Sequence, residues 1–188
     1  MDRYYIERFL HAERGAIRGR VLEMLNAEHT ERFGAGVEKS DVLDIDASNP
    51  SATIVADLAA ADGVPDDAFD CFVLTQTLQY IYDLQSAVRH VHRILRPGGT
   101  VLCTVPTVSR IARRTLETEY WRLTALGCER LFTDAFVGGT VEARAYGNVL
   151  TAVAFLVGMA AEELSTRELD LVDPFFPVLV TIKATKTA

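Results

Sequence analysis

The sequence has few of the features that would assign it to a specialised class of protein. Its three cysteines in 188 residues show no metal-ligand spacing, so neither a disulfide framework nor a metal site is expected. A net charge of −7 argues against a general nucleic-acid binder, which normally carries a basic face. The longest apolar run, Val149 to Ala161, is too short to span a bilayer, and the first residues lack a signal-peptide core. We therefore expect a cytoplasmic protein with no nucleic-acid or membrane partner.

Strand and helix patterns alternate along the whole chain, without a linker or an internal repeat. A chain of this length, with 49% hydrophobic residues, can bury one full core, which predicts a single domain over residues 1–188. Continuous apolar runs predict strands covered on both faces, and therefore an α/β, Rossmann-like doubly wound sheet of seven strands. The predicted strands are Arg20–Met24, Asp41–Ile45, Thr53–Ala56, Phe69–Thr75, Thr100–Val105, Val141–Tyr146 and Val178–Ala184. The predicted helices are Tyr4–Ile17, Leu84–Leu95, Glu117–Phe136 and Val149–Leu164.

The stretch from Phe69 to Pro106 is the most informative part of the sequence. It reads as a strand, a polar loop, a helix, the tight turn RPGG and a second strand, which suits one parallel crossover unit. In such sheets the ligand lies at the carboxyl ends of the strands. The loop Gln76–Tyr82 and the segment after Pro106 therefore mark the expected working edge.

The phrases FDCFVLTQTLQYIYD and HRILRPGGTVLCTVP resemble the class I S-adenosylmethionine-dependent methyltransferases. The resemblance extends from Arg20 to Lys183. It implies S-adenosylmethionine as the cofactor, and a mostly parallel sheet whose last strand is inserted antiparallel. The phrases YWRLTALGCERLF and YGNVLTAVAFLVGMAAEEL are also similar to small bacterial methyltransferases of sugar or natural-product biosynthesis.

The resemblance also implies which residues bind the methyl donor. Glu23, at the end of the first strand, lies near the amino-acid moiety of the donor. Asp46 accepts hydrogen bonds from the ribose hydroxyls of the donor, and Asp44 is the alternative candidate for this role. Asp57 accepts from the adenine amino group. The full set of implied donor-binding residues is Glu23, Met24, Leu25, Asn26, Asp44, Asp46, Asp57, Leu58, Thr75, Gln76 and Thr77. Each carboxylate could instead cap a helix or turn, and Glu23 could form a surface ion pair.

The sequence departs from this family at the loop after the first strand. The family places a G-x-G-x-G loop there, but this chain has Leu25, Asn26 and Ala27. Glycine lets the backbone approach a ligand because it has no Cβ. Three outcomes follow: the donor is displaced, Asn26, His29 and Thr30 supply side-chain hydrogen bonds, or the donor does not bind.

A second departure is the short segment between Asp46 and Asp57. It leaves room for a strand and a turn, but for no full helix. One face of the sheet is then thinly covered at this edge. A second subunit is one way to cover it, so a homodimer is an option.

Methyl transfer requires alignment of the acceptor with the methyl group, and an alcohol acceptor also benefits from a general base. His29 is the candidate base because it lies in the loop that faces the donor; alternatively it replaces the missing glycines as a polar binding residue. Tyr80, Tyr120 and Trp121 are candidates for the acceptor pocket, since aromatic rings suit a sulfonium or a sugar ring. Ordinary helix packing is the alternative for these three aromatic residues.

Three functions compete at this stage. The first is a methyltransferase that acts on a hydroxyl, or less readily an amine, of a small-molecule acceptor such as a sugar or natural product. The second is a non-catalytic, methyltransferase-like partner subunit, suggested by Leu25 and Ala27. The third, a Rossmann-type oxidoreductase, is the weakest because the first loop offers no glycines for a pyrophosphate.

Overall fold

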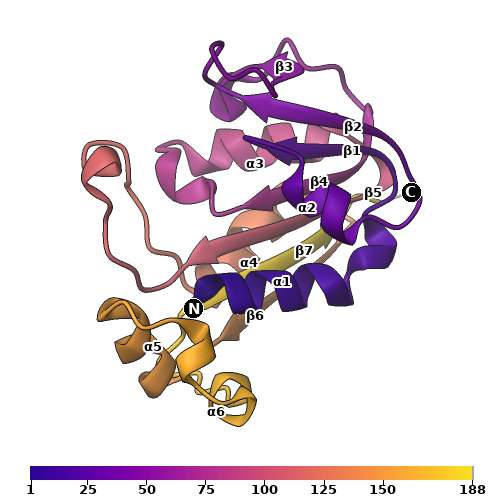
Figure 1. The fold of residues 1–188 in the computed structure, drawn as a ribbon. Helices are drawn as coiled ribbons and strands as arrows, with labels where there is room; N and C mark the ends of the chain where they lie inside the picture. The colour runs from indigo at the N-terminus through magenta and orange to yellow at the C-terminus, as the bar shows by residue number, and fades with distance from the viewer. Residues whose placement is uncertain (188) are drawn as a thin grey trace.

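A single seven-stranded sheet forms the centre of the computed structural model, which describes residues 1–187. The strand order is β3-β2-β1-β4-β5-β7-β6, and β7 runs antiparallel to both of its neighbours (Figure 1). The strands are β1 (Gly19–Met24), β2 (Val37–Asp44), β3 (Ile54–Val55), β4 (Phe69–Thr75), β5 (Leu95–Pro106), β6 (Thr140–Tyr146) and β7 (Leu179–Thr185). The predicted doubly wound sheet with an antiparallel last strand is confirmed.

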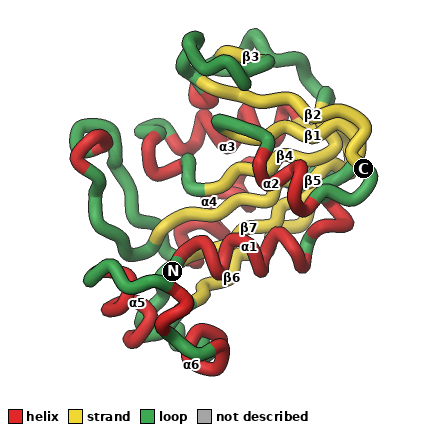
Figure 2. The backbone as a smooth tube through the Cα atoms, viewed as in Figure 1, coloured by secondary structure: helices red, strands yellow, loops and turns green. Residues whose placement is uncertain are grey.

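Helices cover both faces of the sheet, as Figure 2 shows. Helices α1 and α2 lie on one face, where Leu10 and Val21 belong to the same buried cluster, and α3 and α4 lie on the other, where Phe72 and Phe132 do. The helices are α1 (Asp2–Ala12), α2 (Glu28–Phe33), α3 (Leu84–Ile94), α4 (Ala125–Ala135), α5 (Val149–Leu156) and α6 (Thr166–Asp170). None of the described helices is long and apolar enough to cross a membrane.

The crossover unit from β4 to β5 follows the sequence closely. Asp83 caps α3 by accepting a hydrogen bond from the Ser86 backbone N–H, at 2.9 Å, a contact that contributes about 1 kcal/mol. Gly98 has φ +77°, a conformation that favours glycine. A Cβ on Gly99 would lie 3.0 Å from the Phe69 carbonyl oxygen, so this glycine allows the close approach of β5 to β4.

The helix predicted over Glu117–Phe136 is wrong in its first half, because α4 begins only at Ala125. Thr124 caps α4 by accepting from the Gly127 backbone N–H. The preceding segment is a turn followed by an irregular loop, because the backbone N–H groups of Tyr120 and Trp121 donate to the Gln79 carbonyl instead of forming helical hydrogen bonds. The acceptor-side aromatic residues therefore lie on a loop.

Two other predicted helices are too long at their C-terminal ends. The helix predicted over Val149–Leu164 ends at Leu156, where Gly158 adopts φ +82° and stops the helix. The helix predicted over Tyr4–Ile17 ends at Ala12, and a short 3-10 turn follows. As predicted, no helix lies between β2 and β3.

Candidate active site

A cavity of about 830 Å³ opens at the carboxyl ends of β1, β2 and β4. Its volume lies in the range of small-molecule sites. All of the sequence-predicted site residues except Asp46 and Trp121 line the cavity. The residues that line it are Glu23, Met24, Leu25, Asn26, His29, Asp44, Asp57, Leu58, Thr75, Gln76, Thr77, Tyr80 and Tyr120. The strand ends thus bring together residues that are far apart in the sequence.

Two residues of the cavity wall have backbone conformations that are unusual for side-chain-bearing residues. Leu25 has φ 69° and Gln76 has φ 47°. Such strain clusters at functional sites and persists only where the surrounding structure holds it. Asn49 holds the first loop, because its Nδ2 donates to the Leu25 carbonyl at 2.7 Å. Leu25 therefore adopts a glycine-like backbone without being a glycine.

Glu23 is buried and ties the first strand to the start of α2. Its carboxylate accepts hydrogen bonds from the backbone N–H groups of His29, at 3.0 Å, and of Thr30, at 2.7 Å. These bonds satisfy two of the free N–H groups at the N-terminus of α2. The alternative of a surface ion pair for Glu23 is wrong, since its exposed fraction is 1%.

The same carboxylate orients the imidazole of His29. The His29 Nδ1 lies 2.7 Å from the Glu23 Oε1. Because a carboxylate only accepts hydrogen bonds, Nδ1 carries the proton and donates it to this bond. In the neutral ring, Nε2 then presents a lone pair and can accept a proton. His29 lies on the first turn of α2, not in the loop that the sequence predicted.

Asp44, at the end of β2, lies on the cavity wall and is 8% exposed. Its Oδ1 accepts from the Asp46 backbone N–H at 3.0 Å, and its Oδ2 accepts from the Asn49 Nδ2 at 2.6 Å. Each carboxylate oxygen can accept a second bond, so capacity for a ligand remains.

Asp46 lies outside the cavity, in contrast to the role implied by the resemblance. Its Oδ1 accepts from both the backbone N–H and the hydroxyl of Ser48, and these bonds lower the pKa of Asp46 below its ordinary value. The carboxylate therefore closes a turn, which was the alternative considered from the sequence.

Asp57 and Leu58 form the part of the wall that follows β3. Asp57 is exposed, and its Oδ1 accepts from the Ala59 backbone N–H at 2.9 Å, at the start of a 3-10 turn. Leu58 is 3% exposed and joins the core. The capping alternative thus holds for Asp57, but its Oδ2 makes no hydrogen bond within the described residues and remains able to accept one from a ligand.

The loop after β4 is anchored to the neighbouring strand β5. The Gln76 backbone N–H donates to the Thr104 carbonyl at 2.9 Å, and its Nε2 lies 3.4 Å from the Thr104 hydroxyl. The Thr77 hydroxyl donates to the Thr75 carbonyl at 2.9 Å. These bonds fix the loop at the strand end that faces the cavity.

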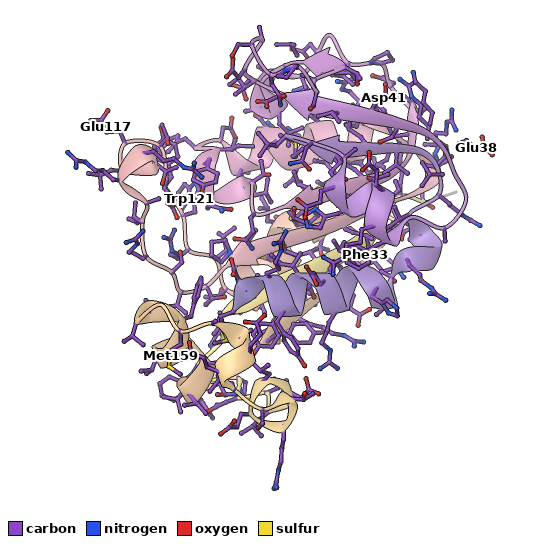
Figure 3. All side chains as sticks on the ribbon, in the orientation of Figure 1. Phe33, Glu38, Asp41, Glu117, Trp121 and Met159 are labelled. Carbon is purple, nitrogen blue, oxygen red and sulfur yellow. The ribbon has the colours of Figure 1, made fainter. Side chains whose placement is uncertain are left out.

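Aromatic side chains form the outer rim of the cavity. Tyr80, Tyr82 and Tyr120 line it, and the rings of Tyr82 and Tyr120 meet edge to face at 5.3 Å. Trp121 stacks on Tyr82, with 5.8 Å between the ring centroids, and its indole N–H donates to the Ile81 carbonyl. Figure 3 shows Trp121 on the loop that precedes α4. Packing is therefore the role that the structure supports for Trp121.

Sequence reasoning missed several residues that line or support the cavity. Tyr82 belongs to the loop Gln76–Tyr82, which the sequence had marked, but it was not singled out. Asn49, which holds both Leu25 and Asp44, was interpreted only as a turn residue. Arg3 reaches the wall from α1, and no local pattern in the sequence signals this contact.

The cysteines of the described residues do not line the cavity. All three cysteines are buried and free, and burial raises the pKa of the Cys71 and Cys128 thiols to about 12. Their thiolate forms are therefore scarce at neutral pH, which makes them unreactive. Within residues 1–187 no group of three His, Cys, Asp or Glu side chains is placed to hold a metal ion.

Comparison with known proteins agrees with this architecture. A family model described as a methyltransferase domain matches residues 13–142, which is more than half of the chain. A ubiquinone/menaquinone biosynthesis C-methyltransferase from Caulobacter sp. strain K31 is 31% identical over 75 residues, which cover 40% of this chain. The match spans only 27% of that relative's length.

Solved structures show the same fold at low sequence identity. A SAM-dependent methyltransferase from Archaeoglobus fulgidus has a TM-score of 0.63 at 13% identity, covering 98% of this chain and 94% of that one. A Haemonchus contortus phosphoethanolamine N-methyltransferase in complex with S-adenosyl-L-methionine has a TM-score of 0.66 at 14% identity, covering 98% and 53%. With the family model, the strand order and the cavity at the strand ends, these findings show that the chain belongs to the class I S-adenosylmethionine-dependent methyltransferase family.

Proposed function

We propose that this chain transfers the methyl group of S-adenosylmethionine to a hydroxyl group of a small metabolite, such as a sugar or a natural product. The observation that carries the proposal is the Glu23–His29 pair on the cavity wall, in which Glu23 holds Nδ1 and leaves Nε2 free to accept a proton. A hydroxyl acceptor needs such a base more than an amine does, because a neutral amine already presents its lone pair.

The donor fits the cavity through residues at three strand ends. Asp44 accepts hydrogen bonds from the ribose hydroxyls, a role supported by its burial on the wall. Asp57 accepts from the adenine amino group beside Leu58, and Gln76 and Thr77 flank the sulfonium end. When bound, the donor supplies an activated methyl group. The chain's own contribution is to align the acceptor and to remove its proton.

The acceptor enters over the tyrosine rim. Tyr80, Tyr82 and Tyr120 present aromatic faces and hydroxyl groups, with exposed fractions of 39%, 71% and 49%. Such faces suit the apolar face of a sugar or an aromatic ring, and the hydroxyls add hydrogen bonds. Trp121 supports the proposal indirectly, because it holds the ring of Tyr82 in place.

Leu25→Gly is expected to bind the donor more tightly and to raise the melting temperature by about 1–4 °C. The change removes an exposed side chain from the wall and relieves a left-handed conformation that costs about 1–2 kcal/mol. The greater entropy of unfolded glycine offsets about 0.5–1 kcal/mol of that gain. Calorimetric titration and thermal melting measure the two effects.

Ala27→Gly is the matched control, because Ala27 has φ −104°, which is not the left-handed conformation, and does not line the cavity. Its donor affinity should equal that of the wild type. Weaker donor binding by Leu25→Gly would show instead that the leucine side chain contacts the donor.

The acceptor class is tested with labelled donor and pairs of small molecules that differ only in a hydroxyl or an amine at one position. Sugars and phenols with the free hydroxyl are expected to take up label faster than their amine counterparts. Preference for the amine members would contradict the proposal. Donor binding with no transfer to any member would favour the non-catalytic partner suggested by Leu25 and Ala27.

A further inference from the structure

A large apolar surface lies around α5, and the hollow in it shares no residue with the wall of the candidate active site. Its members are apolar residues of α5, of its C-cap and of the segment before β7, each at least 42% exposed, and we call them the α5 patch: Val149, Leu150, Val153, Leu156, Val157, Phe175 and Phe176. The hollow of about 380 Å³ at its centre is lined by five of them and by Thr107 and Val108, just after β5.

This patch exceeds the scattered apolar residues of an ordinary surface. Phe175 is 85% exposed and Val157 is 69% exposed. From their exposed fractions the seven residues present on the order of 700 Å² in total, which approaches the ~800 Å² per partner of a standard interface. Contiguous apolar surface of this size marks an interaction site.

Charged residues of opposite sign lie on two segments to either side of α5, namely the loop after β5 and the segment that includes α6 (Figure 1). The loop after Val108 carries the exposed residues Arg110, Arg113 and Arg114, which we call the basic strip, and none of them forms an ion pair within residues 1–187. Glu117 lies on the same loop and reduces the net charge of the basic strip from +3 to +2. On the other side, α6 packs against α5, since the Asn148 amide donates to the Glu168 carbonyl oxygen.

The second strip is acidic. It comprises Glu162, Glu163 and Glu168, all of them exposed, and the neighbouring exposed Arg167 reduces its net charge to −2. Figure 1 shows α5 between α6 and the loop that carries the basic strip, and Figure 3 shows Met159, which leads from α5 to the acidic strip, in the same region. An apolar centre with one strip of each sign is complementary to itself after a two-fold rotation.

We propose that the α5 patch is the interface of a homodimer, in which the basic strip of one copy faces the acidic strip of the other. The apolar centre supplies the burial, and the two strips fix the register. This interface differs from the thinly covered edge at β3 that the sequence suggested for a homodimer. The acidic strip also disfavours an anionic lipid surface as the occupant.

The test measures molecular mass by sedimentation equilibrium at low ionic strength. The wild-type chain is expected to be a dimer and Val153→Asp a monomer that retains its donor affinity. Val137→Asp is the matched control, because Val137 is 77% exposed and lies outside the patch. It should remain a dimer.

Charge reversal separates a second copy from any other occupant. A basic-strip variant (Arg113→Glu with Arg114→Glu) and an acidic-strip variant (Glu162→Lys with Glu163→Lys) should each be monomeric alone. Their equimolar mixture should form a heterodimer, because both contacts across the two-fold axis become attractive again. A monomeric wild type at all concentrations, with or without binding to anionic vesicles, would overturn the proposal, as would a dimer that all these variants leave intact.

Discussion

His29→Gln is expected to lower the rate of methyl transfer to a hydroxyl acceptor by about 10²- to 10⁴-fold, the usual contribution of a general base. The glutamine side chain can still donate to Glu23, but it has no nitrogen lone pair that accepts a proton at neutral pH. The donor dissociation constant should change little. Initial rates with labelled donor and calorimetric titration measure the two quantities.

An amine acceptor provides the discriminating readout for the same variant. Its neutral form presents a lone pair, so His29→Gln should slow its methylation far less than that of a hydroxyl acceptor. His11→Gln is the matched control, since His11 is exposed at the end of α1. A large loss of donor affinity with unchanged turnover would assign His29 to donor binding and refute its role as a base.

Asp44→Asn is expected to weaken donor binding by about tenfold to a hundredfold. A hydrogen bond to a charged group contributes about 1.5–3 kcal/mol, and tenfold in affinity corresponds to about 1.4 kcal/mol. The asparagine retains one oxygen to accept from the Asp46 backbone N–H and loses the acceptor for the Asn49 Nδ2, which still donates to the Leu25 carbonyl, so the fold should persist. Titration with S-adenosylhomocysteine measures the loss, and thermal melting verifies the fold.

Asp46→Asn separates the two carboxylates. Asp46 is exposed, and its hydrogen bonds go to Ser48, so this variant should bind the donor as the wild type does. A loss in Asp46→Asn that equals or exceeds that in Asp44→Asn would return the ribose role to Asp46. If both variants bind normally, the donor lies elsewhere on the sheet edge.

Much of the fold could be predicted because each early strand is a continuous apolar run. The crossover unit Phe69–Pro106 is local, since its cap at Asp83 and its turn at Gly98 act within a few residues. In the pairing of β5 with β7, Thr100 lies opposite Thr185. No local sequence pattern predicts a contact between residues so far apart in the chain.

The errors at the helices come from contacts between distant segments. The segment before α4 has the composition of a helix. Its Tyr120 and Trp121 backbone N–H groups donate instead to the Gln79 carbonyl, which lies more than 40 positions earlier in the chain. The helix predicted over Val149–Leu164 was too long for a different reason. Gly158 is present in the sequence, but the sequence does not show that this glycine adopts a left-handed conformation and ends the helix.

The candidate site was predicted as a set of strand ends, but not in detail. The sequence could not distinguish Asp44 from Asp46, because two residues of spacing do not show where the strand stops. The structure ends β2 at Asp44 and turns the chain there, which directs Asp46 toward Ser48. The Glu23–His29 contact was also invisible, because it depends on where α2 begins.

Calorimetric titration of the wild-type chain with S-adenosylmethionine tests the central claim most directly. The claim is that a loop with Leu25 and Ala27 in place of glycines still forms a donor site, because Asn49 and Glu23 hold its backbone. We predict saturable binding with one donor per chain. No heat of binding at millimolar donor would contradict this account of the site.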